Sequence, residues 1–205
     1  MEYGKARVER ETVPRRCLVA QSGPSRKEAE AFIAAHFRVA HQAHIRQFMP
    51  TLLGARDDHG RLIIACGLRA AERERRFFLE SYLKQPVEAA LSSAMGGTVT
   101  RARVVEVGNL AAASPATARE LIAALTHYLS SAPFEWVVFT GVAALRNSFR
   151  RLGIPLVDLG SALLEALPEE ARDDWGDYYR SSPRVCAVSI YESRIALNRC
   201  GEKAA

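Results

Sequence analysis

Residues 103–111 read Arg-Val-Val-Glu-Val-Gly-Asn-Leu-Ala, and two residues later the chain continues over 114–125 as Ser-Pro-Ala-Thr-Ala-Arg-Glu-Leu-Ile-Ala-Ala-Leu. The first stretch is rich in β-branched residues and predicts a strand, whereas the second, with Ser114 as N-cap and Pro115 at the first helical position, predicts a helix. A strand that leads directly into a helix directs free backbone N–H groups and the positive end of the helix dipole to one place. This turn suits a phosphate group, although any α/β protein also contains such turns for structural reasons.

The rest of the sequence alternates between strand and helix patterns. Residues 136–140 are typical of a buried strand, and residues 143–152 form an amphipathic pattern that Gly153 ends. Ser25, with Glu28 three residues later, is the expected N-cap of a first helix. The other expected elements are strands at 16–21, 51–56, 62–68, 154–157 and 184–191, an extended segment at 76–83, and helices at 25–46, 86–95 and 161–167.

These elements predict a single α/β domain with a mixed central sheet flanked by helices, in the order β-α-β-β-(β)-α-β-α-β-α-β-α-β. We expect a polar leader at 1–14, the domain at 15–192 and a C-terminal tail at 193–205. A chain of 205 residues with 48% hydrophobic and 25% charged residues is long enough to bury one core, and this composition excludes disordered, collagen-like and disulfide-scaffold proteins.

The charge balance of 28 Lys+Arg against 23 Asp+Glu gives a net charge of 28 − 23 = +5, which favours anionic partners. The first residues lack the apolar run of a secretory signal, and no segment is apolar for long enough to span a membrane. We therefore expect a cytoplasmic protein without stable membrane insertion. The four cysteines form no CxxC pair, so neither a disulfide framework nor a zinc site is expected.

Two glutamates are candidate catalytic residues. Glu106 lies among valines in the strand at 103–111, where a carboxylate must be paired, hydrogen-bonded or raised in pKa, and these are also the conditions of a tuned general base. The structural alternative is an ion pair with Arg69 or Arg103. Glu80 lies beside aromatic residues and can bind or deprotonate an amine, or it can be a solvated carboxylate at a strand end.

Other clusters carry weaker signals. His36, His41 and His44 lie on or near one helix, but no carboxylate accompanies them in a metal-binding motif, so no metal site is expected. The charge run at 69–76 is typical of a solvated loop, although its arginines can also receive phosphates. A nucleic-acid partner is not expected, because no aromatic residues interleave with these arginines. The aromatic segment at 175–179 is either ordinary packing or the wall of a substrate pocket.

The order of these elements resembles that of GNAT-type acyltransferases, with a helix that carries Asn147 and ends in Leu152-Gly153. The resemblance implies an acyl-carrier site followed by a substrate pocket. The implied carrier-binding residues are Gly108, Asn109, Leu110, Ala111, Ser114, Thr117, Arg119 and Asn147. The implied pocket residues are Arg69, Tyr82, Thr140, Trp175, Tyr178 and Tyr179. The glycine-rich loop of the GNAT pattern is absent, because residues 113–118 contain no glycine.

Several blocks taken together resemble the thermostable hemolysin family of bacterial proteins over roughly residues 30–190. These blocks are Gly67-Leu-Arg69, Phe78-Leu-Glu-Ser-Tyr-Leu83 with Pro86-Val-Glu88, Val105-Glu-Val-Gly-Asn-Leu-Ala111, Trp136-Val-Val-Phe-Thr140, Arg146-Asn147, Leu152-Gly153 and Trp175-Gly-Asp-Tyr-Tyr179. Acyl-homoserine lactone synthases carry a Glu-x-x-Arg-Phe block where this chain has Glu106 to Leu110. Asn109 replaces the arginine of that block, so homoserine lactone synthesis is not expected.

The resemblance implies an N-acyltransferase in which an amine attacks a thioester directly. The expected co-substrate is acyl-CoA or the phosphopantetheine of acyl carrier protein, with no permanently bound cofactor, and the acceptor is a small amine or an amino-acid-like molecule. Glu106 or Glu80 would take the proton of the amine, and a β-bulge near Gly108 would expose an N–H group to the thioester oxygen. The alternatives are a membrane-active protein, as the family name suggests, and a binding module without catalysis.

Overall fold

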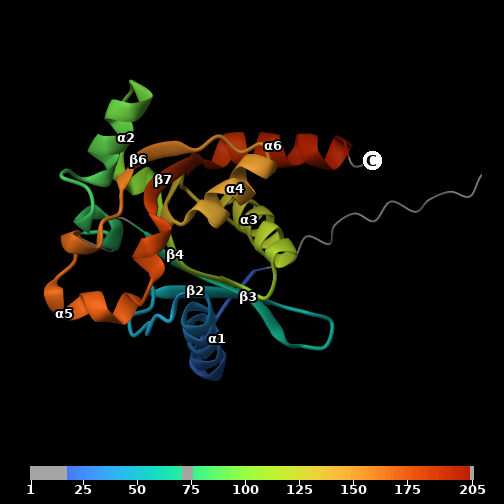
Figure 1. Ribbon diagram of the computed structural model, residues 1–205. Coiled ribbons are helices and arrows are strands. Elements are labelled where there is room, and N and C mark those ends of the chain that lie inside the picture. The colour runs from blue at the N-terminus through green and yellow to red at the C-terminus, as the bar shows by residue number, and fades with distance from the viewer. Residues whose placement is uncertain (1–17, 71–75, 204–205) are drawn as a thin grey trace, which may run out of the picture.

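The computed structural model describes residues 18–70 and 76–203, which form one α/β domain around a mixed sheet of seven strands in the order β1-β2-β3-β4-β5-β7-β6 (Figure 1). The strands are β1 (Val19–Ala20), β2 (Thr51–Arg56), β3 (Leu62–Ala70), β4 (Val104–Ala112), β5 (Trp136–Gly141), β6 (Val157–Ser161) and β7 (Arg184–Ser189). Neighbouring strands are antiparallel except for β4 and β5, which are parallel. The predicted fold class is therefore confirmed.

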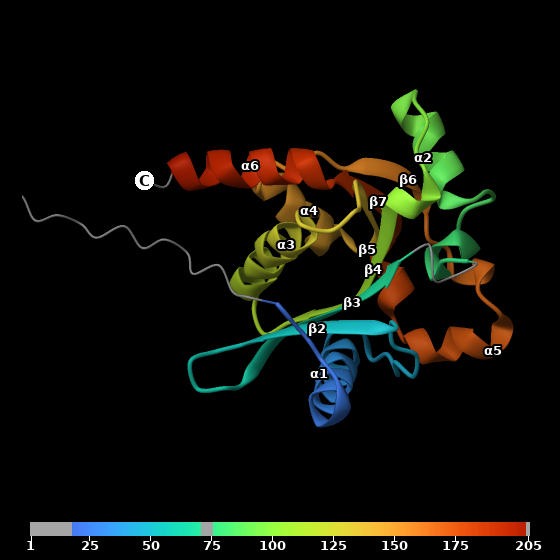
Figure 2. The ribbon, with the colours of Figure 1, turned by 180° about the vertical axis from the view of Figure 1, so that it is seen from behind.

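Helices cover both faces of the sheet. They are α1 (Gly23–His41), α2 (Val87–Met95), α3 (Pro115–Leu129), α4 (Ala143–Arg151), the short α5 (Glu169–Arg172) and α6 (Ile190–Lys203). Both ribbon views show α1 on one face of the β2–β4 half and α3 with α6 on the opposite face (Figures 1 and 2). None of the helices in the described ranges is long and apolar enough to cross a membrane.

The apolar core follows the alternation of side chains along the strands. On β2, Leu52 packs in the cluster under α1, whereas its neighbour Leu53 packs in the cluster under α3. Successive strand residues face opposite sides of a sheet, so each strand of this half contributes to two cores. A third apolar cluster joins Val87 and Leu91 of α2 to β5 and β7.

The strand and helix that define the fold form as the sequence predicts. The Ser114 hydroxyl accepts a hydrogen bond from the backbone N–H of Thr117 at 3.1 Å, and Pro115 begins α3. The hairpin of β2 and β3 also forms, and the Asp57 carboxylate accepts the N–H groups of His59 and Arg61 in its turn. Both features depend on neighbouring residues, which is why the local pattern predicts them.

The prediction for the first helix is wrong at both ends. Ser22, not Ser25, is the N-cap residue, because Gly23 and Pro24 already belong to the first turn, where proline is favoured. At the other end, Gln42 adopts the left-handed conformation with φ of 54° and closes the helix at His41 instead of near residue 46.

Four other predictions are corrected by the structure. The expected extended segment at 76–83 is a 3₁₀ turn over Phe78–Ser81. The strand expected at 154–157 lies at Val157–Ser161, and the helix expected at 161–167 contains only the 3₁₀ turn Leu164–Ala166. The last strand ends at Ser189, opposite the first residue of β5, instead of at Tyr191, and α6 begins directly after it.

Some predictions fall outside the described residues. They concern the leader at 1–14, the beginning of the strand at 16–21, Cys17 and most of the charge run at 69–76.

Candidate functional site

A cavity of about 940 Å³ lies between the diverging ends of β4 and β5. The helices α3 and α4 line one side of it, and residues from 37–49 and 171–178 line the other. Of the residues predicted from the sequence, those that line the cavity are Arg69, Glu106, Gly108, Asn109, Leu110, Ala111, Ser114, Arg119, Thr140, Asn147, Trp175 and Tyr178. The structure therefore brings together most of the predicted site.

The cavity exists because β4 leaves β5 halfway along its length. The two strands pair only from Val104 opposite Trp136 to Val107 opposite Phe139. β4 then continues to Ala112 along β3, while β5 continues along β7. Since two strands that separate cannot satisfy each other's backbone groups, the wedge between them is a place where an extended ligand can bind.

The predicted bulge in β4 is confirmed. Between the pairs Gly67–Gly108 and Ala65–Ala111, β3 advances by two residues and β4 by three. Asn109 lies in this bulge with φ of 50°, a left-handed conformation that asparagine tolerates better than most residues. Its side-chain oxygen accepts a hydrogen bond from the backbone N–H of Met49 at 2.8 Å.

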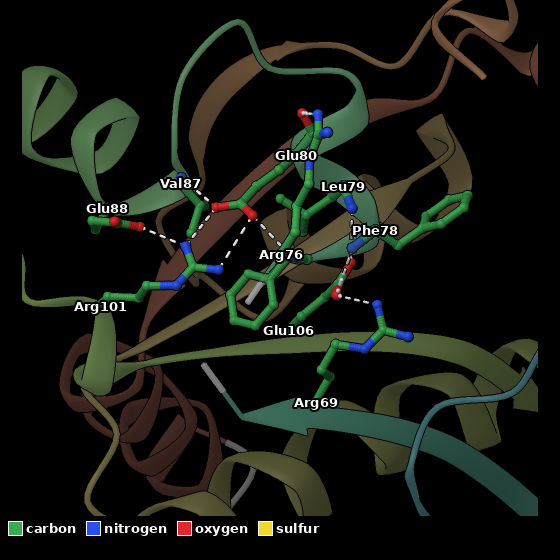
Figure 3. Close-up of polar contacts among 10 residues, drawn as sticks. Arg69, Arg76, Phe78, Leu79, Glu80, Val87, Glu88, Arg101 and Glu106 are labelled. Atoms are coloured by element: carbon green, nitrogen blue, oxygen red, sulfur yellow. Dashed lines mark hydrogen bonds and ion pairs between the residues drawn. The ribbon is translucent and has the colours of Figure 1, made fainter. Parts of the chain in front are cut away.

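Glu106 is buried in the wall of the cavity, with 2% of its surface exposed. Its Oε1 accepts the N–H of Leu79 at 3.0 Å, and its Oε2 accepts the N–H of Phe78 at 3.2 Å and lies 3.4 Å from Nη1 of Arg69 (Figure 3). Burial raises the pKa of Glu106, while the Leu79 N–H, Arg69 and the Phe78 N–H oppose that rise. The net result is a pKa above the ordinary value, as a general base near neutral pH needs.

The ion pair predicted as the structural alternative for Glu106 is present with Arg69 but not with Arg103. Arg103 instead lies 3.8 Å from Glu135 and donates to the carbonyl of Pro133. The pair with Arg69 is loose, at 3.4 Å, so it does not by itself exclude a catalytic role for Glu106.

Glu80 lies next to this group but does not line the cavity. It is 5% exposed, so the prediction of a solvated carboxylate at a strand end is wrong. Its oxygens accept hydrogen bonds from the N–H groups of Phe77 and Val87 and from the guanidinium of Arg101 (Figure 3). Burial raises the pKa of Glu80, but Arg101 and the two N–H groups outweigh it and hold the pKa below its ordinary value.

The other predicted residues, Thr117, Tyr82 and Tyr179, do not line the cavity. The hydroxyl of Thr117 is 2.8 Å from that of Ser114. Tyr82 and Tyr179 share a hydrogen bond of 2.5 Å between their hydroxyls, and burial raises the pKa of Tyr179 to about 12. Tyr178, which does line the cavity, donates its hydroxyl to the carbonyl of Thr140 at 3.3 Å.

Two polar atoms near the cavity have no hydrogen-bond partner among the described residues. They are Nε of Arg69 and Oγ1 of Thr140, and both are buried. Because an unpaired buried polar atom is costly, these two atoms mark places where a bound molecule can supply the missing partner.

Sequence analysis predicted Trp175 as part of a pocket wall, but not that residues 41–49 and 174–177 lie together and form it. The N–H of His44 donates to the carbonyl of Asp174 at 2.6 Å, and the N–H of Asp177 donates to the carbonyl of His41 at 2.9 Å. Arg46 also lies 3.2 Å from Asp174. No local signal predicts a contact between segments so far apart in the chain.

The described residues include no group of three or more His, Cys, Asp or Glu side chains that could hold a metal ion. His41, whose pKa burial lowers, packs edge-on against Tyr178, and His44 lies 3.3 Å from a guanidinium nitrogen of Arg38. These histidines are parts of the cavity wall, not a cluster.

Solved structures of three synthases resemble this chain. FeeM, an N-acyl amino acid synthase from uncultured soil microbes, aligns with a TM-score of 0.59 at 15% identity and covers 91% of this chain and 96% of its own. The acyl-homoserine lactone synthase LasI gives 0.56 at 10% identity, covering 89% and 95%. BjaI, a CoA-dependent acyl-homoserine lactone synthase with SAM and isopentyl-CoA, gives 0.54 at 14% identity, covering 91% and 90%. At such low identity these likenesses show the fold.

A comparison with curated proteins found no match. The sequence profile described as thermostable hemolysin, in contrast, matches residues 19–194, which include every strand of the sheet and the whole cavity wall. The chain belongs to the thermostable hemolysin family.

Proposed function

We propose that the protein is an N-acyltransferase that moves an acyl group from a thioester of CoA or acyl carrier protein to a small amine. The observation that carries the proposal is the position of Glu106, a buried carboxylate with a raised pKa in the wall of a cavity that extends along both sides of the β4 bulge. The fold is shared with proteins described as synthases of N-acyl amino acids and of acyl-homoserine lactones, which supports this reaction class.

The wedge between β4 and β5 is the proposed path of the thioester arm. Phosphopantetheine carries amide groups, which can bond to the backbone of β4 beyond Val107, where β5 no longer pairs with it. The N-terminus of α3 at Ser114 lies at the cavity, where the helix dipole favours a phosphate group. Arg119 and Asn147 line the same region and are the proposed further contacts of the carrier.

The acyl chain has an apolar route into the core. From the bulge, the cavity continues between α3, α4 and β5, where its lining includes Leu121, Ile122, Leu125, Val137, Phe139 and Phe149. An acetyl group does not reach these side chains beyond the bulge, whereas a longer acyl chain can be buried among them. We therefore propose a donor with an extended acyl chain, each of whose buried CH₂ groups adds about 0.8 kcal/mol of binding.

The acceptor is proposed to bind on the other side of Glu106, against Phe78, Trp175 and Tyr178. Glu106 and Arg69 together present a negative and a positive group, 3.4 Å apart, to the same cavity. An amino acid carries the complementary pair, since its ammonium suits Glu106 and its carboxylate suits Arg69. FeeM is described as an N-acyl amino acid synthase, which agrees with such an acceptor.

The reaction then needs no covalent intermediate on the protein. The bound ammonium gives one proton to Glu106, and the free amine attacks the carbonyl carbon of the thioester. The C–S bond breaks as the C–N bond forms, and the thiolate takes the second proton that the nitrogen loses. An N–H group at the β4 bulge is the proposed donor to the developing oxyanion, as in other acyl transfers.

The test is a turnover assay with purified protein, a series of acyl-CoA and acyl-carrier thioesters from two to sixteen carbons, and a panel of amino acids and amines. Thiol release and the acylated product are measured together. The variant Glu106→Gln is expected to lose about 10²–10⁴-fold in kcat/KM, as for removal of a general base. Glu165→Gln, at an exposed carboxylate, is the matched control. Absence of both thioester turnover and thioester binding by the unaltered protein would overturn the proposal.

A further inference from the structure

The carboxylate of Glu80 joins the start of the turn over Phe78–Ser81 to the start of α2. Oε2 of Glu80 accepts the N–H of Phe77 at 2.7 Å, and Oε1 accepts the N–H of Val87, the first residue of α2, at 2.9 Å. Glu80 therefore fixes the positions where the chain enters the turn and where it reaches the next helix.

Arg101 completes this arrangement from a distant part of the chain. Its Nη1 lies 2.6 Å from Oε1 of Glu80 and 2.8 Å from Oε2 of Glu88, and its guanidinium stacks over the ring of Phe77 at 4.8 Å (Figure 3). A buried carboxylate with a bonded arginine is costly to disturb, because breaking the pair leaves an unpaired charge. We call Glu80 and Arg101 the turn clamp.

The same turn supplies two of the three groups that stabilise ionised Glu106. They are the N–H groups of Phe78 and Leu79, the two residues that directly follow Phe77. Their directions depend on the shape of the turn, and that shape depends on the turn clamp.

We propose that Glu80 is a positioning residue, which with Arg101 holds two backbone N–H groups on Glu106 and so keeps this carboxylate ionised for proton transfer. The proposal rests on the proposed function, in which Glu106 is the base. It replaces the direct catalytic role that the sequence suggested for Glu80, since Glu80 does not line the cavity.

Geometry and charge make opposite predictions for Glu80, which makes the proposal testable. The negative charge of Glu80 raises the pKa of Glu106, whereas the N–H groups of Phe78 and Leu79 lower it. The N–H of Leu79 lowers this pKa by more than the charge of Glu80 raises it. Removal of the charge alone therefore lowers the pKa of Glu106, whereas release of the turn raises it.

The other charged or titratable groups around Glu106 come from several elements. Arg69 on β3 lowers the pKa of Glu106, and Glu106 in turn raises the pKa of the Tyr82 hydroxyl. Groups that line the same cavity are His41, His44, Arg46 and Asp174. All of these groups are unchanged in the variants described below. They therefore do not decide whether the pKa of Glu106 rises or falls.

The experiment is the pH profile of kcat/KM for the full chain and for Glu80→Gln. Glutamine has about the same shape but cannot accept hydrogen bonds with both of its terminal atoms, so it loosens the clamp. We expect the acid limb of the profile to move to higher pH by about one unit, the order of size for losing hydrogen bonds to a carboxylate. An unchanged limb, or one that moves to lower pH, would overturn the proposal even if overall activity falls.

Glu88→Gln is the matched control. Glu88 also pairs with Arg101, and the Glu88→Gln variant loses the same charge as Glu80→Gln. Among its described contacts, however, Glu88 accepts no N–H group of the turn. We expect its acid limb to stay where it is in the unaltered protein. An upward shift equal to that of Glu80→Gln would mean that the two N–H groups bound by Glu80 are not what controls Glu106, and would also overturn the proposal.

Two further measurements keep the proposal falsifiable. If Glu80→Gln does not fold, Arg101→Lys weakens the clamp while it keeps the positive charge, and it must shift the limb in the same direction. If the unaltered protein has no transferase activity, the proposed function fails, but the ionisation of Glu106 can still be followed by infrared difference spectroscopy against Glu106→Gln. A higher midpoint in Glu80→Gln supports the clamp, and an equal or lower midpoint overturns it.

Discussion

The side-chain oxygen of Asn109 accepts the backbone N–H of Met49 and thereby joins the bulge of β4 to the segment that follows α1. Met49 also covers the glycines of two neighbouring strands. A Cβ atom built on Gly67 lies 2.4 Å from Cβ of Met49, and one built on Gly108 lies 2.5 Å from its terminal methyl, Cε. Met49 therefore lies where the wedge between β4 and β5 meets the part of the cavity wall formed by residues 41–49.

We expect Gly67→Ala to destabilise the protein more than Gly108→Ala. At Gly67 the new methyl meets atoms close to the backbone of Met49, whereas at Gly108 it meets only the flexible end of the side chain. The expected cost is about 2–3 kcal/mol at Gly67 and about 1 kcal/mol or less at Gly108, within the usual range for overpacking. Urea unfolding measures both, and equal values would contradict the role of Met49 as a fixed cover.

The part of the cavity wall formed by residues 41–49 and 174–177, on the proposed acceptor side, gives a second prediction. Gly176 has φ of 52°, and a Cβ there would lie 2.2 Å from the carbonyl oxygen of His41, which accepts the N–H of Asp177. We expect Gly176→Ala to raise KM for the acceptor by about tenfold, as for loss of about 1.4 kcal/mol of binding, and to leave KM for the thioester unchanged.

Gly96→Ala is the control for an alanine at a positive φ without such a clash. Gly96 has φ of 68°, but a Cβ there meets nothing within 4 Å. With ψ of 22° it lies in the left-handed region, where an alanine costs about 1–2 kcal/mol, whereas Gly176, with ψ of −123°, lies outside that region. Steady-state kinetics should show a change in acceptor KM for Gly176→Ala alone, and a similar change in both variants would refute the prediction.

The two buried glutamates should affect stability with opposite dependence on pH. The folded state raises the pKa of Glu106 above 4.5, so that its contribution to stability is complete below this value and is lost as pH rises through the folded pKa. The folded state lowers the pKa of Glu80, so that its contribution is present above 4.5 and is lost as pH falls through the folded pKa.

Thermal unfolding between pH 4 and pH 8 checks this prediction with Glu106→Gln and Glu80→Gln. Relative to the unaltered protein, Glu106→Gln should gain stability as pH rises, whereas Glu80→Gln should lose stability as pH rises from the acid end. If stability changes with pH in the same direction in both variants, then it is wrong that burial dominates the pKa of Glu106 and that bonding to Arg101 and the N–H groups dominates the pKa of Glu80.

The acyl route gives a further prediction, with a control on the same helix. Leu125 and Leu129 both lie in the apolar cluster beneath α3, but only Leu125 lines the cavity. We expect Leu125→Phe to shorten the preferred acyl chain by a few carbons, with about fourfold less kcat/KM for each CH₂ that no longer fits, the equivalent of about 0.8 kcal/mol.

Leu129→Phe adds the same volume one turn away and should leave the chain-length preference unchanged while it costs about 1–3 kcal/mol of stability. A thioester series from two to sixteen carbons measures both variants. If both variants keep the preference of the unaltered protein, the acyl chain does not lie under α3.

The sequence predicted those parts of the molecule whose causes are local. Ser114, Pro115 and the valines around Glu106 determine their own strand and helix, whereas the bulge at Gly108 and Asn109 was expected from the resemblance to acyltransferases. The burial of Glu106 could be predicted for the same reason, because three valines surround it in one strand.

What the sequence could not predict depends on contacts between distant residues. The segment at 76–83 looks extended, but its turn is formed by Glu80 together with Arg101 and Val87, which lie later in the chain. The expected continuation of α1 past His41 fails because that stretch pairs with the carbonyl of Asp174 and the N–H of Asp177. Periodicity carries no information on such partners, so the pairing of residues 41–44 with residues 174–177 could not be predicted, although Trp175 and Tyr178 were expected to line a pocket.

The short pairing between β4 and β5 has a consequence for the whole molecule. Four residue pairs, Val104–Val107 with Trp136–Phe139, are the only ladder that joins the two halves of the described sheet. A thioester arm lying in the wedge would extend this ladder and bridge the two halves. A ligand stabilises the state that binds it. Donor binding would therefore strengthen the contact between the half that ends in β4 and the half that begins with β5. The two halves would separate more easily in the protein without a donor.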